Sequence, residues 1–219
     1  VACALPEAAH AFNRARLPFR SVSGLLGLEE TPSFAKADER TADRPEAQDA
    51  WREIGQWCAA ASVRAALRDA RFGFLGNYYS GMLDMYSDFT MLQAQTGVQL
   101  EVLEMCDLAG ELAAVTPEQV REKEEQIADF FTISGDSPRD PIARRPTAEQ
   151  LAWSARVAAA QEALVRSRGL DALAYYYHGR DGNEYERLQS GFIVGHSLLT
   201  AAGIPCAGEG DVKTAIAMK

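Results

Sequence analysis

The residue best placed to do chemistry is Glu209, which lies between Gly208 and Gly210, directly after the short apolar stretch 204–207. Glycine neighbours allow the backbone to bend sharply and a ligand to come close. A carboxylate presented in this way can bind a divalent cation through its oxygens, or move a proton next to a carbonyl carbon. The alternative is an acid that favours the positive end of the helix that follows, which fits Asp211 better than Glu209.

Two other loops carry polar side chains directly after apolar stretches. The first begins with Asn77 and includes Tyr79, and the second begins with Tyr177 and His178. Amide, phenol and imidazole groups suit a ligand that carries many hydroxyl groups. We therefore expect these four side chains to line a polyol-binding site. For His178, a hydrogen bond within its own loop is an equally good interpretation.

Residues 175–177 are three consecutive tyrosines. Neighbouring side chains of a strand point to opposite faces, so at least one tyrosine must lie on each face of the sheet. His196 lies among Ile193, Val194 and Leu198 in a helical pattern. A histidine in these surroundings is more often a hydrogen-bonded core or interface residue than a catalytic one.

Several common motifs are missing from the sequence. It contains no GxGxxG or Walker A sequence, so a nucleotide-phosphate cradle is not expected. It also contains no HExxH sequence or other pair of histidines at ligand spacing, which makes a self-contained zinc site an unfavoured interpretation.

Apolar stretches of strand length alternate with amphipathic stretches of helical length. The predicted strands are residues 71–76, 98–105, 170–177 and 204–207. The predicted helices are residues 45–65, 82–96, 117–131, 148–168, a helix through 192–198 that ends at Gly203, and a last helix that begins at 212. Capping boxes open the helices over 117–131 and 148–168 at Thr116 and Thr147, and Gly97 and Gly169 close the helices over 82–96 and 148–168. The helix over 45–65 carries Trp51 and Trp57, which we expect to pack in the core.

Strands that alternate with long helices indicate an α/β fold. We predict an open, doubly wound parallel sheet of the Rossmann or flavodoxin-like kind, with helices on both faces. Ligands bind such a sheet at the carboxyl ends of its strands. The loops that begin at Asn77 and Tyr177 and the turn that holds Glu209 follow predicted strands, so they are expected at that edge.

The sequence divides into two parts. Residues 27–48 are rich in charged residues and lack periodicity, so we interpret 1–50 as an N-terminal segment at the edge of a preceding domain. Residues 51–219 form the predicted central α/β domain. The chain lacks an initiator Met, and its last helix has no closing Gly, Asn or Pro, so we expect an internal piece of a longer protein, truncated before a C-terminal domain.

Composition narrows the class of protein. The 22 Lys and Arg residues against 31 Asp and Glu residues give a net charge of −9, which argues against nucleic-acid and anionic-membrane surfaces. No stretch approaches the about 18 consecutive apolar residues of a membrane span. The four cysteines form no CxxC pair, so free thiols in a reducing cytoplasm are the simplest interpretation.

Residues 207–215, AGEGDVKTA, resemble a motif of the L-arabinose/L-fucose isomerase family, on the arabinose isomerase side. Arg71-Phe72-Gly73 after a Trp-bearing helix, the strand that ends at Tyr177, and Leu198-Leu199 before Gly203-Ile204-Pro205 follow in the order of that family's central domain. The resemblance covers about residues 51–219. The chain differs from the better-known arabinose isomerases in its Tyr-rich strand and in the stretch 27–48, so the sugar itself is left open.

The resemblance implies an aldose–ketose isomerase that uses a divalent metal, usually Mn²⁺, and acts on a monosaccharide in the cytoplasm. It implies that Glu209 is a metal ligand and a candidate proton-transfer residue. The other ligands would come from sequence beyond Lys219. Asn77, Tyr79, Tyr177 and His178 would line the sugar site. The family also implies a homo-oligomer in which neighbouring subunits complete each site.

Two alternatives remain at this point. The chain could belong to a non-catalytic sugar-binding or regulatory module with the same fold, or to a different α/β enzyme that uses a nucleotide, against which the missing phosphate motifs count. We expect the chain to be inactive alone, because one carboxylate cannot fill the several ligand positions that a divalent ion needs.

Overall fold

The structure is a computed structural model that describes residues 4–22, 28–29, 36–37, 45–140, 142, 144–179 and 182–219. The chain divides into two compact units, Val1–Val63 and Arg64–Lys219. Helix α3 (Pro45–Leu67) runs through residue 50, where the sequence-based prediction places the boundary between 1–50 and 51–219. Most of the charged stretch 27–48 lies outside the described residues, as does the middle of the loop after Tyr177.

The first unit contains helix α1 (Ala4–Arg14), the two-residue strands β1 (Leu28–Glu29) and β2 (Lys36–Ala37), which pair antiparallel, and most of α3. Phe12 and Phe19 stack with their ring centroids 5.6 Å apart. None of the helices in the described part of the chain is long and apolar enough to cross a membrane.

Trp51 and Trp57 on α3 do not fill a core. Their side chains are 50% and 52% exposed, so the prediction that they pack inside is wrong. Helical spacing shows which side chains share a face of a helix, but it does not show whether another element covers that face.

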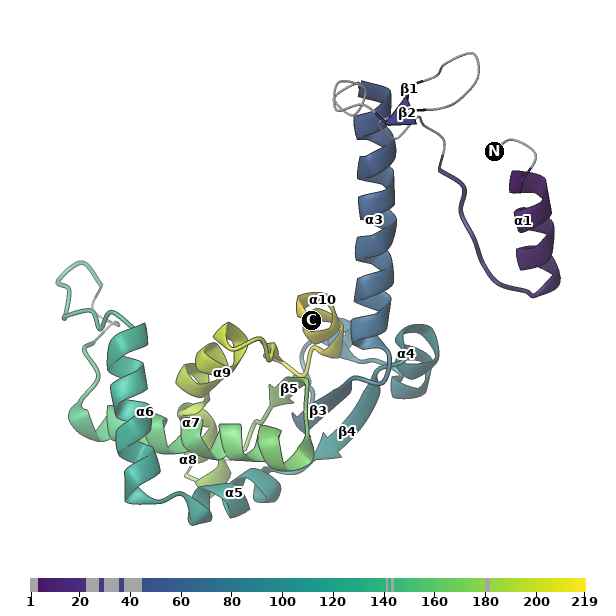
Figure 1. Ribbon diagram of the computed structural model, residues 1–219. Helices are drawn as coiled ribbons and strands as arrows, with labels where there is room; N and C mark the ends of the chain where they lie inside the picture. The colour runs from purple at the N-terminus through teal and green to yellow at the C-terminus, as the bar shows by residue number, and fades with distance from the viewer. Residues whose placement is uncertain are drawn as a thin grey trace. The chain divides into compact units, whose positions relative to one another are not determined.

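The second unit is built on a sheet of four parallel strands in the order β4-β3-β5-β6. Figure 1 labels the first three of them, β4, β3 and β5. The strands are β3 (Arg71–Gly76), β4 (Gln99–Leu103), β5 (Ala172–Tyr176) and β6 (Cys206–Ala207). All four lie inside the stretches predicted from sequence. The α/β prediction with a parallel, Rossmann-like sheet is therefore confirmed.

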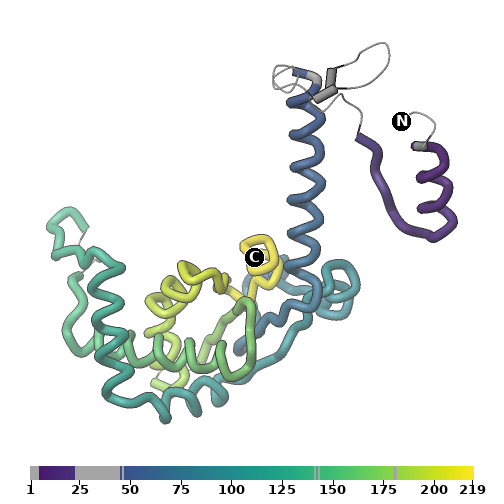
Figure 2. The backbone as a smooth tube through the Cα atoms, in the orientation of Figure 1, coloured from purple at the N-terminus to yellow at the C-terminus, as the bar shows by residue number. Residues whose placement is uncertain are grey.

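Helices cover both faces of this sheet, and the path of the chain between them can be followed in Figure 2. The helices of this unit are η1 (Leu83–Met85, a 3₁₀ turn), α4 (Phe89–Thr96), α5 (Met105–Ala114), α6 (Pro117–Phe130), α7 (Ala148–Arg168), α8 (Glu184–Ser190), α9 (Phe192–Ala201) and α10 (Val212–Met218). Of these, α6 packs against α7 rather than against the sheet. On one face, Leu75 and Leu173 share a buried cluster with residues of α5, α7, α8 and α9. On the other, Phe74 and Ala174 cluster with residues of α4 and α10.

Local signals set the ends of the helices. Thr116 and Thr147 open α6 and α7 with capping boxes, in which each hydroxyl accepts from the amide three residues on and a glutamine side chain accepts in return. Gly97 and Gly169 close α4 and α7 in the left-handed conformation. These four predictions are confirmed.

One predicted helix differs from the structure, and helices α1, α5 and α8 are not among the predicted ones. The helix expected over 82–96 is a 3₁₀ turn followed by α4, because the Asp88 carboxylate accepts from the amides of Thr90 and Met91 and starts a new helix there. Helix α5 was not predicted. The Asp107 carboxylate accepts from the amide of Glu104 and so caps the start of α5. This signal was missed because Glu104 belongs to the stretch 98–105, which was interpreted as a strand.

Candidate active site

The order of the strands fixes where a ligand would bind. The chain goes from β3 outward to β4 and then returns to the other side of β3 to form β5. In open parallel sheets, ligands bind outside the carboxyl ends of the strands where the order reverses in this way. The loop that begins at Asn77 leaves β3 at this point and the loop that begins at Tyr177 leaves β5, so both flank the reversal.

Glu209 lies in the turn between β6 and α10. It is one of three non-glycine residues with positive φ in the described part of the chain, at 60°. A side chain in this conformation costs about 1–3 kcal/mol, and such positions concentrate at functional sites. The Oε2 atom of Glu209 is buried and has no hydrogen-bond partner within the described residues. The turn therefore holds a carboxylate oxygen whose hydrogen-bonding capacity is unsatisfied among the described residues.

The neighbouring Asp211 has a different role. Its carboxylate accepts from the Thr214 amide (3.0 Å) and from the Thr214 hydroxyl (2.6 Å), which caps α10. Lys213 donates to the backbone carbonyl of Asp84 and ties α10 to the 3₁₀ turn. The prediction that Asp211 is the helix-terminal acid is confirmed, whereas Glu209 makes no capping bond that is recorded for α10.

The loops after β3 and β6 meet over the end of β5. The Asn77 amide donates to the carbonyl of Tyr176 (2.7 Å), and the Gly210 amide donates to the carbonyl of Tyr175 (3.0 Å). The Tyr79 amide donates to the carbonyl of Glu209 (3.1 Å). Backbone bonds thus hold Asn77, Tyr79 and Glu209 at one edge of the sheet.

Gly210 is required for this meeting. Its φ is +74°, and a Cβ atom there would lie 2.8 Å from the Asn77 carbonyl oxygen and 3.1 Å from the Tyr78 Cα. No other residue could let the two loops approach so closely without moving one of them. A Cβ on Gly208 would meet only the ring end of Tyr175, at 3.8 Å or more.

Aromatic rings gather beside Glu209. Tyr79 lies edge-on to Tyr176, with ring centroids 5.2 Å apart. His178 is nearly parallel to Tyr176, at 4° and 6.4 Å between centroids. Tyr79 is 37% exposed and His178 is also exposed, so both rings can reach a ligand. Burial raises the pKa of Tyr176, with further contributions from the charge of Glu209 and from Tyr79, so its hydroxyl stays protonated as a donor.

Two of the predicted residues contact other partners. The hydroxyl of Tyr177 accepts from the side-chain amide of Asn183 (2.6 Å), and its ring lies edge-on to Tyr185. The Asn77 side-chain oxygen accepts from the amide of Tyr78 (2.8 Å). The structure thus brings Tyr79, His178 and Glu209 together around Tyr176, while Tyr177 faces the α8 side.

Sequence reasoning did not include Tyr175 and Tyr176 in the site, although both lie beside the Glu209 turn. Alternation along β5 sends Tyr175 and Tyr177 to the α9 side and Tyr176 to the other. The three consecutive tyrosines were the signal in the sequence that could have identified these residues. The register of β5 against β3, which pairs Tyr176 with Gly76, decides which tyrosine lies beside the Glu209 turn.

His196 and Gln161 form a buried polar pair behind Tyr175. They are 5% and 0% exposed, and their Nε2 atoms lie 2.8 Å apart. As predicted, His196 is a core histidine, but its Nδ1 atom and the Oε1 atom of Gln161 have no partner in the described residues. A buried polar atom without a partner costs about 1–3 kcal/mol. Burial also lowers the pKa of His196 from 6.5 to about 3, so its ring is neutral.

The donor set provides a test for the implied metal. Across the described ranges, no group of three or more His, Cys, Asp and Glu side chains could hold a metal ion. Glu209 offers one carboxylate oxygen without a partner, whereas a divalent ion in a protein needs several ligands. The described residues therefore supply one metal-ligating group, Glu209, and do not supply a complete metal site.

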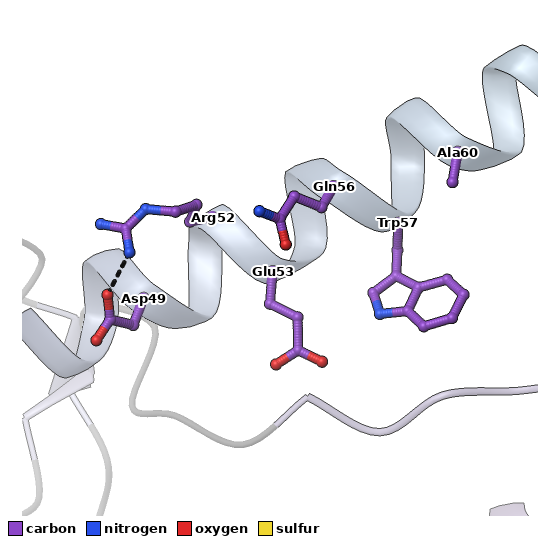
Figure 3. A pocket seen from close by; sticks show the side chains of 6 residues that line it. All are labelled: Asp49, Arg52, Glu53, Gln56, Trp57 and Ala60. Carbon is purple, nitrogen blue, oxygen red and sulfur yellow. Dashed lines mark hydrogen bonds and ion pairs between the residues drawn. The ribbon is translucent and has the colours of Figure 1, made fainter.

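Two hollows of the surface lie away from these residues. One of about 700 Å³ is lined by Asp49, Arg52, Glu53, Gln56, Trp57 and Ala60 along α3 (Figure 3), where Arg52 pairs with Asp49. Another, of about 730 Å³, lies between the start of α7 and residues of α8 and α9. Neither includes a predicted site residue. In comparisons with known proteins, the chain matches no protein-family model and no curated protein.

Proposed function

We propose that this chain is part of a metal-dependent aldose–ketose isomerase, similar to the L-arabinose and L-fucose isomerases, that interconverts an aldose and its ketose. One observation carries the proposal. The Glu209 carboxylate lies in a left-handed turn at the carboxyl edge of a parallel sheet, and its buried Oε2 atom has no partner among the described residues. The protonated hydroxyl of Tyr176 lies nearby. Its motif, residues 207–215, supports the same activity.

The reaction moves a hydrogen between C1 and C2 of the sugar and exchanges the carbonyl and hydroxyl groups of these carbons. In the proposal, Glu209 accepts the proton from C2 of the aldose and returns it to C1. The Tyr176 hydroxyl, which its surroundings keep protonated, donates a hydrogen bond to O1 as negative charge develops there. The proton of the O2 hydroxyl moves to O1, so that the carbonyl group passes from C1 to C2. A divalent ion, Mn²⁺ in the family that the motif resembles, would polarise the two neighbouring sugar oxygens when bound. Glu209 would be one of its ligands, and the described residues do not supply the others.

The sugar would lie against the aromatic rings at this edge. Tyr79 and His178 present exposed rings that both lie near Tyr176. Asn77 and Tyr177 complete the proposed set, although each needs a ligand to compete with its present partner, Tyr78 or Asn183. Monosaccharides offer hydroxyl groups for these polar atoms and apolar C–H faces for the rings.

Replacing Glu209 tests the proposal. In the full-length protein, Glu209→Gln keeps the size of the side chain and removes its charge, so we expect isomerisation to fall by at least about 10³-fold. The matched control is Glu125→Gln, on an exposed position of α6, with activity unchanged. Conversion of aldose to ketose is followed by NMR with added Mn²⁺ over a panel of aldopentoses and deoxyhexoses. Full activity of Glu209→Gln would reject the assigned role.

The second candidate is a sugar-binding or regulatory module of the same fold without catalysis. A binding module needs no metal, and the described residues by themselves hold no complete metal site. Calorimetry separates the two proposals. Sugar binding by the full-length protein that is unaffected by Mn²⁺ and by EDTA, with no conversion, would support the binding module.

We also propose a cytoplasmic location and a homo-oligomer. The three cysteines that the structure describes, Cys58, Cys106 and Cys206, are free thiols, which suits a reducing compartment. The oligomer follows from the resemblance alone, and light scattering of the full-length protein tests it.

A further inference from the structure

A line of polar side chains runs from the core to the Glu209 turn. We call it the polar seam, and it consists of Gln161 in α7, His196 in α9 and Tyr175 in β5. Gln161 and His196 are the two polar side chains that are fully buried in the described part of the chain. The His196 ring lies 3.9 Å from the ring of Tyr175, centroid to centroid, and both rings contact Phe192.

The polar seam needs a glycine in the middle of a helix, which lowers the stability of that helix. Gly195 lies inside α9, where a glycine weakens a helix. A Cβ atom at this position would lie 1.8 Å from Gln161 Oε1 and 2.8 Å from the Cα of Ala158. Apolar side chains of similar volume would fill the same space without leaving Gln161 Oε1 and His196 Nδ1 unpaired. Packing alone therefore does not explain the seam.

Tyr175 connects the seam to both neighbours of Glu209. Its carbonyl accepts from the amide of Gly210 (3.0 Å), and its hydroxyl lies 3.8 Å from the position of a Cβ on Gly208. The hydroxyl thus lies against the residue before Glu209, and the carbonyl holds the residue after it. Burial, Cys206 and the charge of Glu209 all raise the pKa of the Tyr175 hydroxyl, which agrees with a position close to that carboxylate.

We propose that Tyr175 is a positioning residue for Glu209, and that Gln161 and His196 hold the Tyr175 ring in place from the core. The seam keeps the turn in its left-handed conformation and holds the Glu209 carboxylate in its observed position. The structural part of this inference stands by itself, and only its effect on turnover rests on the proposed function.

Hydrogen exchange tests the structural part on the chain. The Gly210 and Tyr79 amides report the turn, because they donate to Tyr175 and Glu209, and the Asp171 amide, which donates to Arg71, reports the opposite end of the sheet. Two variants are compared: Tyr175→Phe, which removes only the hydroxyl, and the double variant Gln161→Leu/His196→Leu, which fills the seam with apolar side chains. The control is Tyr86→Phe, a half-exposed tyrosine outside the turn.

We expect both seam variants to fold and the Gly210 and Tyr79 amides to exchange about tenfold faster, while the Asp171 amide is unchanged. Unchanged exchange at Gly210 and Tyr79 in both variants would overturn the inference. If the double variant fails to fold, Tyr175→Phe decides the matter alone, since it leaves the buried pair intact.

Kinetics of the full-length protein test the effect on turnover. We expect Tyr175→Phe to lower kcat about tenfold with KM within about twofold, because a displaced base slows the chemical step without weakening sugar binding. A wild-type protein without isomerase activity would reject the proposed function and leave the exchange result standing. An active wild type with unchanged kcat in Tyr175→Phe would reject the positioning role in catalysis and leave the proposed function standing.

Discussion

The two ends of the parallel sheet treat charge in opposite ways. Where β3 and β5 begin, Arg71 contacts Glu101 (2.5 Å), and Arg168 contacts both Glu101 (3.2 Å) and Asp107 (2.9 Å). Asp171 accepts from the Arg71 amide and contacts Lys219. Every charged group in this network has an opposite charge beside it.

At the carboxyl end, Glu209 has no ion pair with any residue that the structure describes, and its Oε2 atom is buried without a hydrogen bond to any of them. Its backbone is also in an unfavourable conformation. Charge thus stabilises the fold at one end of the sheet, whereas at the other end the fold accepts an unfavourable backbone conformation and a buried carboxylate oxygen that has no partner among the described residues.

The largest effect is expected from breaking the carboxyl end at Gly210. Gly210→Ala should destabilise the chain by about 2–4 kcal/mol, because φ is +74° and the new Cβ would lie 2.8 Å from the Asn77 carbonyl oxygen. The neighbouring Gly208→Ala is the control and should stay within about 1 kcal/mol of the wild type. Urea unfolding followed by circular dichroism measures both. Equal stability of the two variants would show that the loops do not meet as described.

The next effect concerns the histidine behind the carboxyl end. Burial lowers the pKa of His196 from 6.5 to about 3 in the folded state, so the unfolded chain binds the proton more tightly. The contribution of the neutral His196 ring to the stability of the fold is thus complete above the pKa of this histidine in the unfolded chain. It is lost as pH falls from 6.5 toward 3. The slope is about 1.4 kcal/mol per pH unit, which gives a loss of about 2 kcal/mol between about pH 6.5 and pH 5.

Urea unfolding at several pH values above about 5, where carboxylates stay ionised, measures this slope. The double variant Gln161→Leu/His196→Leu should lose it, whereas His178→Gln, at an exposed position, should keep it. A wild-type free energy of unfolding that does not change over this range would mean that His196 is accessible to protons in the folded chain.

The fold could be predicted largely from sequence because its signals are local. The apolar residues 71–76 are bounded by polar residues and a turn, and they form β3 over that range. Thr116 and Thr147 mark helix starts through side chains three residues away. The role of Asp88 as a helix cap was not predicted, because the apolar pattern of 82–96 continues on both sides of it. Its capping bonds start α4 and so prevent one continuous helix over 82–96.

The surroundings of Glu209 depend on distant contacts, which sequence does not show. Its place after an apolar stretch is local, but its neighbours Tyr175 and Tyr176 are set by the register of β5 on β3. The contact between Gln161 and His196 joins residues 35 positions apart on two helices, and no spacing rule connects them. The conformation of Glu209 itself follows from the loops that hold it, because φ 60° is not what a glutamate prefers.

The smallest effect is expected at the paired end. Arg168 contacts two carboxylates, but its side chain is 41% exposed, so solvent screens both pairs. Arg168→Ala should therefore cost only about 0.5–1 kcal/mol, and less in about 0.5 M NaCl. Arg121→Ala, which removes a single exposed pair with Glu118, should cost about half as much or less. A loss above about 2 kcal/mol for Arg168→Ala would show that the network is one cooperative unit, and the contrast with the carboxyl end would then be larger than the separate pairs indicate.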